Sequence, residues 1–275
     1  MSIGQADAGF AQGPELLTLR GVSKSFGAVQ ALTDIDLDVG ASEVVALLGD
    51  NGAGKSTLVK ILAGVHPADS GTIRFRGRPV TISSPAESRA LGIATVYQDL
   101  ALCDNLDVVA NLFLGKEDSR FATLGEETME RRAWTLLRQL AAKIPSVRTP
   151  VASLSGGQRQ TVAIARSLVG EPSIIILDEP TAALGVAQTA EVLNLIERLR
   201  DRGHGILLIT HNMADVQEVA DRAVVLRLGR NNGVFKLPET SHQEIIAAIT
   251  GATDSVVMRR AAVTAARKAG KETSS

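Results

Sequence analysis

The feature that most constrains this chain is a glycine-rich turn between a strand and a helix. Glu43–Leu48 is an almost continuous apolar segment, which is typical of a strand covered on both faces. Leu58–Ala63 is apolar and helix-like. The residues between them read Gly49-Asp50-Asn51-Gly52-Ala53-Gly54-Lys55-Ser56 and fit G-x-x-x-x-G-K-[ST] in the strand-to-helix context that this pattern requires. The chain therefore contains a predicted phosphate-binding loop.

Each part of this loop has a chemical reason. Glycines let consecutive backbone N–H groups turn inward around phosphate oxygens, and the following helix adds the positive end of its dipole. Lys55 neutralises charge on the β- and γ-phosphates, and the Ser56 hydroxyl ligates Mg²⁺. We therefore predict ATP and Mg²⁺ as ligands, with nucleotide-binding residues Gly49, Asp50, Asn51, Gly52, Ala53, Gly54, Lys55, Ser56 and Thr57. The motif alone does not separate kinases, GTPases, transport ATPases and DNA-repair ATPases.

Further along the chain, short apolar segments alternate with helical patterns. The predicted strands after the loop cover residues 71–75, 93–97, 174–177, 205–210 and 223–226, and the predicted helices cover 85–91, 157–169, 186–200, 213–220 and 241–249. Before the loop, residues 17–22 and 35–39 alternate apolar with polar side chains, as strands with one wet face do. These patterns predict an α/β fold: a mostly parallel sheet flanked by helices, with an antiparallel β edge.

The predicted domain organisation is one domain between two tails. Residues 98–156 read as a helical subdomain, because segments 106–113 and 126–142 carry apolar residues at three-and-four spacing and few strand signals. Residues 1–14 lack periodicity and are expected to be a disordered tail. Residues 251–275 form a basic, alanine-rich tail that we expect to be flexible. The single domain is predicted to span residues 15–250.

Two further strands end in residues suited to phosphate chemistry. Asp178 and Glu179 follow the apolar segment 174–177, and His211 follows segment 205–210. In an open parallel sheet, ligands bind at the carboxyl edge, so Asp178 suits the Mg²⁺ shell and Glu179 suits a base that polarises the attacking water. His211 can hold that water and Glu179 in register, and the Gln98 amide can join the metal shell. The plainer alternatives are acids that cap the next helix and surface positions for His211 and Gln98.

Composition limits the class of protein. The formal net charge is −1, so no global basic field indicates nucleic acid as a partner. The single cysteine, Cys103, suits a reducing compartment, and residues 1–14 show no secretory signal. No apolar run approaches the roughly 20 residues that cross a bilayer. We expect a cytoplasmic location and, if the protein serves a membrane, attachment by docking.

A second glycine-rich helix start lies at residues 154–160, which read LSGGQRQ. Ser155 and Gln158 form a predicted capping box, a structural reading that needs no ligand. Two glycines in a first turn, however, cost roughly 1 kcal/mol each against alanine. We therefore predict a second phosphate-binding helix terminus at Ser155, Gly156, Gly157 and Gln158.

With these motifs in order, residues 15–250 resemble the ATP-binding cassette (ABC) ATPase family, whose signature is LSGGQ. The resemblance implies a homodimer in which the signature of one subunit closes on ATP bound by the other. It implies that Phe26 stacks on adenine, at roughly 1–3 kcal/mol for base–aromatic stacking. It also implies that Gln98 links Mg²⁺ to the helical subdomain and a permease, and that Glu179, His211 and Lys55 are catalytic. Gly185 departs from the family, which often has aspartate there.

Segments 97–115 and 211–216 are similar to the ATPases of bacterial sugar importers of the ribose, xylose and fructose group. This resemblance implies an ATPase that powers carbohydrate uptake through a separate integral-membrane permease and, indirectly, a periplasmic sugar-binding protein. The expected location is the cytoplasmic face of the bacterial inner membrane, as a peripheral protein. The alternatives are an importer of a non-sugar solute and a non-transport ABC ATPase, and nothing in the residue chemistry itself reads a sugar.

Overall fold

The computed structural model describes residues 14–116, 119–120 and 123–252. The predicted tails at 1–14 and 251–275 lie outside these residues, apart from Pro14, Gly251 and Ala252. None of the helices within the described ranges is long and apolar enough to cross a membrane.

A six-stranded sheet lies at the centre. Its order is β12 (Arg230–Lys236), β11 (Arg222–Arg227), β3 (Glu43–Leu48), β10 (Gly205–Ile209), β9 (Ile174–Asp178) and β6 (Ile93–Val96). All neighbours pair in parallel except the edge strand β12, which pairs antiparallel with β11. The predicted α/β fold with a mostly parallel sheet is confirmed.

A second sheet is fully antiparallel and forms the predicted β edge. Its order is β2 (Val29–Gly40), β1 (Glu15–Phe26), β4 (Ser70–Phe75) and β5 (Arg78–Val80). The pattern predicted parts of β1, β2 and β4, but β5 and β12 were not anticipated. β12 reads RNNGVFK, which lacks a clear alternation, so its pairing with β11 is decided by tertiary context.

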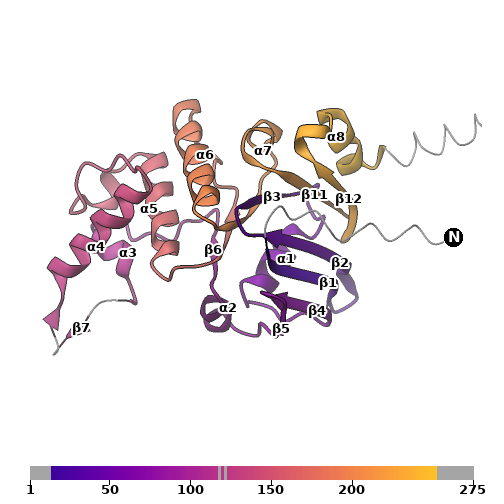
Figure 1. The fold of residues 1–275 in the computed structure, drawn as a ribbon, viewed down its shortest axis with the longest axis horizontal. Coiled ribbons are helices and arrows are strands. Elements are labelled where there is room, and N and C mark those ends of the chain that lie inside the picture. The colour runs from indigo at the N-terminus through magenta and orange to yellow at the C-terminus, as the bar shows by residue number, and fades with distance from the viewer. Residues whose placement is uncertain (1–13, 117–118, 121–122, 253–275) are drawn as a thin grey trace, which may run out of the picture.

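The helices fall into two groups, and the smaller group forms one end of the molecule in Figure 1. Around the sheets lie α1 (Lys55–Leu62), α2 (Pro85–Leu91), α6 (Val186–Asp201), α7 (Met213–Val219) and α8 (His242–Thr250). At one end are α3 (Val108–Phe113) and α4 (Glu126–Gln139), which lie in the segment predicted as a helical subdomain. Beside them is α5 (Gly156–Leu168), which follows that segment and was predicted as a helix over 157–169. The short elements are the strands β7 (Ser119–Arg120) and β8 (Thr123–Leu124) and the 3-10 turns Val151–Ser153 and Leu237–Glu239.

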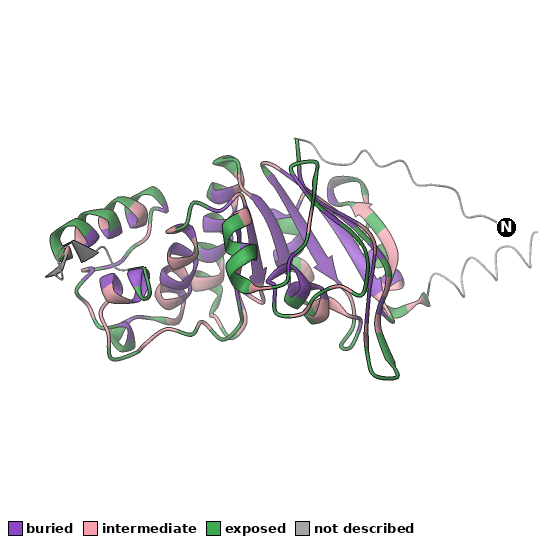
Figure 2. Ribbon diagram, turned by 90° about the horizontal axis from the view of Figure 1, so that it is seen from below, coloured by how far each residue is buried: buried purple, intermediate pink, exposed green. Residues whose placement is uncertain are grey.

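The core has two layers, one on each face of the parallel sheet. Alternate residues of β3 point to opposite sides, with Val44 and Ala46 in one cluster and Val45 and Leu47 in the other. The first cluster includes residues of α3 to α8, and the second includes α1 and the antiparallel sheet. Figure 2 shows the result, with buried strands in the middle and exposed helix faces outside. Burial on both faces explains the continuous apolar character of these strands.

Candidate nucleotide-binding site

The strand order brings the predicted motifs to one edge of the sheet. β10 lies between β3 and β9, and in these pairings Ile209 is opposite both Leu47 and Asp178. β6 lies beside β9, with Val96 opposite Leu177. The carboxyl ends of four parallel strands are therefore adjacent, and the segments that follow them leave the sheet together. These segments carry the phosphate-binding loop, His211, the two acids and Gln98.

A cavity of about 610 Å³ opens at this edge, a volume within the usual range for small-molecule sites. The predicted residues that line it are Asn51, Gly52, Ala53, Gly54, Lys55, Ser56, Thr57, Gln98, Asp178, Glu179 and His211. Gly49 and Asp50 line a neighbouring cavity together with Asn51 and His211. Residues separated by more than 150 positions in the sequence thus share one hollow.

Two glycines of the loop are required by close backbone contacts. Gly49 has φ 150°, and a Cβ there would lie 2.3 Å from the carbonyl oxygen of Leu226. Gly54 has φ 106°, and its Cβ would lie 2.5 Å from the Leu32 side chain. Gly54 is also the N-cap of α1. The loop is therefore pressed against β2 and β11, which leaves its inner side open to a ligand.

Lys55 lies across the loop. Its Nζ donates hydrogen bonds to the carbonyl oxygens of Gly49 at 2.6 Å and Asp50 at 3.1 Å. Burial lowers the pKa of Lys55, while the carboxylates of Glu179, Asp50 and Asp178 oppose this shift. A cation held inside a loop at a helix N-terminus suits a polyanionic ligand.

Burial raises the pKa of Asp178, and the neighbouring Glu179 adds to the rise while Lys55 opposes it. Two acids side by side in a partly buried edge favour a bound cation, because it relieves their mutual repulsion. Within the described residues no group of three or more histidine, cysteine or acidic side chains forms a metal cage. The arrangement fits Mg²⁺ held by few protein groups with phosphate oxygens and water, as this ion prefers.

Glu179 and His211 lie in direct contact. His211 Nδ1 is 2.8 Å from Glu179 Oε1, with the Glu179 side chain 17% exposed and the His211 side chain 79% exposed. The Glu179 backbone has φ +51°, a left-handed conformation that is uncommon for a residue other than glycine. Its N–H donates to the Ile209 carbonyl at 2.8 Å, which fixes this turn to the end of β10.

Other predicted site residues lie outside this cavity. Phe26 ends β1 opposite Val29, which does line the cavity, and Phe26 is 43% exposed. The residues Ser155 to Gln158 do not line the cavity of their own chain. They begin α5, at the helical end of the molecule (Figure 1).

The capping box predicted at α5 is present. Ser155 Oγ accepts from the Gln158 N–H at 3.3 Å, and Gln158 Oε1 accepts from the Ser155 N–H at 2.9 Å. A Cβ on Gly157 would lie 3.1 Å from Cβ of Gln188, and one on Gly156 would lie 3.0 Å from the Leu184 side chain. Close packing on α6 and on the segment just before it is thus a second, structural reason for these glycines.

Some residues of the site were missed by sequence reasoning. Val29, the first residue of β2, and Leu228, in the turn between β11 and β12, are 65% and 79% exposed and line the cavity from segments far apart in the sequence. No local pattern marks them, and only their exposure in the fold draws attention.

The buried Asp215 accepts from Thr181 Oγ1 at 2.5 Å and so ties the segment after Glu179 to α7, which follows His211.

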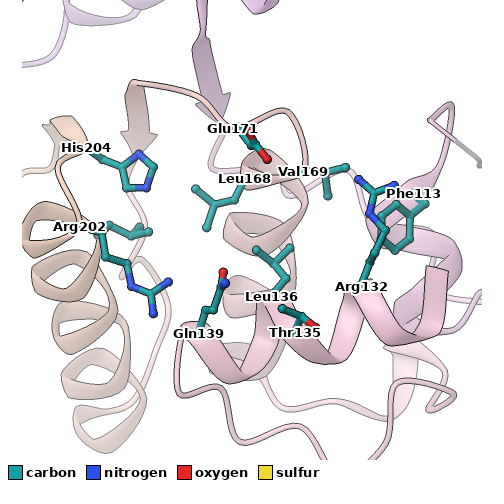
Figure 3. Close-up of a pocket in the computed structure, with 11 residues that line it drawn as sticks. Phe113, Arg132, Thr135, Leu136, Gln139, Leu168, Val169, Glu171, Arg202 and His204 are labelled. Carbon is teal, nitrogen blue, oxygen red and sulfur yellow. The ribbon is translucent and has the colours of Figure 1, made fainter. Parts of the chain in front are cut away.

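A separate cavity of about 360 Å³ lies between α4, α5 and the turn before β10 (Figure 3). Glu171 and His204, which line it, precede β9 and β10 and so lie at the amino edge of the sheet. Burial lowers the pKa of His204, whose Nδ1 lies 2.8 Å from the Pro172 carbonyl oxygen. None of the predicted nucleotide-binding residues belongs to this cavity.

Comparison with known proteins agrees with the geometry. Residues 32–182 match the profile of the family described as ABC transporter. The xylose/arabinose import ATP-binding protein of Sulfolobus acidocaldarius is 46% identical over 236 residues, which cover 86% of this chain and 94% of that protein. The fructose import ATP-binding protein of Rhizobium meliloti is 43% identical over 247 residues, or 87% and 95% of the two chains.

A putative ribose/galactose/methyl galactoside import ATP-binding protein of Burkholderia cenocepacia is 42% identical over 86% of this chain. The matched region covers only 46% of that longer relative. Among solved structures, a nucleotide-free ATP-binding cassette from an ABC transporter has a TM-score of 0.75 and 26% identity, covering 86% of this chain and 95% of that chain. A dimeric bacterial ABC transporter cassette has a TM-score of 0.68 and 27% identity, covering 81% and 99%.

Proposed function

Since this chain belongs to the ABC transporter family, we propose that it is the ATP-hydrolysing subunit of a sugar importer, with a monosaccharide as cargo. The observation that carries the ATPase assignment is the contact between Glu179 and His211 beside Lys55 at the carboxyl edge of the sheet. The sugar assignment rests on relatives that are named as importers of xylose or arabinose, of fructose and of ribose.

In the proposed reaction, water attacks the γ-phosphate in line with the leaving oxygen. Glu179 accepts the proton of that water, and His211 orients Glu179 and contacts the γ-phosphate. Lys55 and the loop amides bind the β- and γ-phosphates. Ser56, Asp178 and Gln98 would hold Mg²⁺, which would neutralise phosphate charge when bound. Most of the rate enhancement comes from positioning and electrostatics, because phosphoryl transfer asks for little covalent chemistry from the protein.

We propose that Ser155, Gly156, Gly157 and Gln158 act on ATP bound by a second copy of the chain. These residues do not line the cavity of their own chain, and a phosphate-binding helix start needs a ligand within reach, which supports the proposal. A two-fold dimer is the simplest arrangement that places each signature on the partner's phosphate loop. One structural neighbour is a cassette solved as a dimer, which also supports this. Gly185 offers no side chain to such a dimer contact, and the next residue, Val186, is 91% exposed.

The proposed permease contact is a groove of about 710 Å³ between the sheet core and the helical segment. Three of its lining residues are large apolar side chains that remain exposed: Val65 at 47%, Tyr97 at 39% and Leu114 at 48%. Exposed apolar side chains gathered in one hollow are typical of a protein interaction site. Gln98 directly follows Tyr97 and lines the nucleotide cavity, so the groove and the nucleotide site are adjacent in the chain.

The protein would then be peripheral, bound to a permease at the cytoplasmic face of the bacterial inner membrane. A periplasmic sugar-binding protein would act on the other side of that permease, without touching this chain.

The test is co-purification of the tagged protein from detergent-solubilised native membranes with Mg-ATP, followed by identification of its partners. A polytopic permease together with a sugar-specific binding protein is the expected result. Recovery with a permease whose binding protein takes a non-sugar solute would overturn the cargo assignment. Recovery with ribosomes or nucleic acid, and with no membrane protein, would overturn transport itself.

A further inference from the structure

Two side chains contact the ring of Phe26, one over its face and one at its edge. Nζ of Lys24 lies 5.5 Å from the ring centroid, over its face. The His66 ring meets it in an edge arrangement, with the two centroids 5.2 Å apart and the planes at 73°. Phe26 nevertheless keeps 43% of its surface exposed, although it is a large apolar residue. An aromatic side chain that is fixed but uncovered suggests a stacking partner outside the chain.

Lys24 is itself held by an acid. Its Nζ forms an ion pair with Asp69 Oδ1 at 2.6 Å, and only 11% of the Lys24 side chain is exposed. The other oxygen of Asp69 accepts from the Ser25 N–H at 2.7 Å. The bond to Lys24 lowers the pKa of Asp69, and the Ser25 bond adds to this effect. Asp69 therefore binds both the Lys24 ammonium group and the backbone N–H of Ser25, the residue before Phe26.

His66 comes from the turn that follows α1. The N–H groups of Val65 and His66 both donate to the Lys60 carbonyl, at 2.8 and 3.3 Å. This turn brings the His66 ring to the end of β1. Since α1 begins in the phosphate-binding loop, one short helix connects that loop to the turn whose His66 contacts Phe26.

We propose that Lys24, Asp69 and His66 are positioning residues that hold the Phe26 ring in the orientation in which it stacks on the nucleotide base. This rests on the proposed function, and within it on Phe26 as the base-stacking residue. The physical gain is preorganisation: a ring already fixed loses little rotamer freedom when the base binds. The three residues act on the base alone, so they leave the affinity for the phosphate chain unchanged.

The experiment compares the dissociation constants of ATP and of inorganic tripolyphosphate, measured by calorimetry on the full chain. Lys24→Met and His66→Leu should each raise the dissociation constant of ATP about three-fold, the size expected from losing one partly exposed cation–π or ring contact. Tripolyphosphate affinity should not change. Lys24→Arg keeps the cation and should restore ATP binding. The control is Lys60→Met, which removes an exposed cation from α1 and should affect neither ligand.

A double-mutant cycle gives the decisive reading. In a Phe26→Ala background, which should itself weaken ATP about ten-fold through lost stacking, Lys24→Met and His66→Leu should have no further effect. Equal weakening of both ligands by Lys24→Met would overturn the proposal, because it would mean a disturbed fold. The proposal would also be overturned if Lys24→Met and His66→Leu weakened ATP binding by the same factor in the Phe26→Ala background as in the wild type. An ATP affinity that stayed unchanged in every variant would overturn it too. Failure of the wild-type chain to bind ATP would instead contradict the proposed function.

Discussion

Nδ1 of His211 lies 2.8 Å from Oε1 of Glu179, between segments that follow two adjacent parallel strands. The two residues are 32 positions apart, and Glu179 meets His211 from a left-handed backbone conformation, φ +51°. Strain of this kind persists where the surrounding structure enforces it, and it is frequent at functional sites. The pair explains why the base assignment falls on Glu179 rather than on its neighbour Asp178.

Glu179→Gln should bind ATP but hydrolyse it about 10²- to 10⁴-fold more slowly, because an amide does not accept the proton of the attacking water. The variant should accumulate as an ATP-bound dimer. Steady-state phosphate release and size-exclusion chromatography with ATP measure the two effects. Glu191→Gln on the exposed face of α6 is the matched control and should leave turnover unchanged. Near-normal turnover in Glu179→Gln would remove Glu179 from the role of base.

His211→Ala should lower turnover about 10²-fold, because Glu179 and the attacking water lose their alignment. Because the His211 side chain is 79% exposed, its loss should change the free energy of unfolding by no more than about 0.5 kcal/mol. Turnover and urea denaturation on the same preparation separate the two quantities. His242→Ala, at an exposed position of α8, serves as control. Loss of turnover that followed a large loss of stability would contradict a role in alignment.

Asp178→Asn should stabilise the nucleotide-free protein at pH 8 and abolish Mg²⁺-dependent hydrolysis. Burial raises the pKa of Asp178, so its charged form is less favourable in the folded chain than in the unfolded one. The wild type therefore gains stability relative to the variant as the pH falls through this raised pKa, because protonation removes the charge. Melting temperatures from pH 8 down to pH 4 should show a gap between variant and wild type that narrows with acid. If the difference in melting temperature between variant and wild type grew as the pH fell, the pKa of Asp178 would not be raised by folding.

Gly49→Ala should destabilise the chain by about 3 kcal/mol or more and prevent nucleotide binding. Its Cβ would overlap the Leu226 carbonyl oxygen at 2.3 Å, in addition to the strain of φ 150°. Gly52→Ala is the informative partner, because no atom lies within 4 Å of its Cβ position and only the backbone strain at φ +79° remains. That variant should lose about 1–2 kcal/mol. Equal losses in urea denaturation would show that the contact with β11 is not what requires Gly49.

Much of this molecule follows from local sequence. The glycine-rich loop, the apolar strand before it and the α5 capping box are each written in fewer than ten consecutive residues. Backbone dihedral preference and side-chain periodicity act over such distances, which is why β3 and α2 were predicted to the residue. The position of Glu179 and His211 at a shared edge was also predictable, because parallel strands place their carboxyl ends together.

Tertiary structure decided what no short segment encodes. The order of the strands places β10 between β3 and β9, and only this order makes the Glu179–His211 contact direct. Strand β12 forms because β11 offers an unpaired edge, while its own sequence shows no strand pattern. Val29, at the start of β2, and Leu228, in a turn, line the nucleotide cavity although they are 199 positions apart. Such contacts depend on how sheets and helices pack, a property of the whole chain, whereas motifs and periods depend only on neighbouring residues.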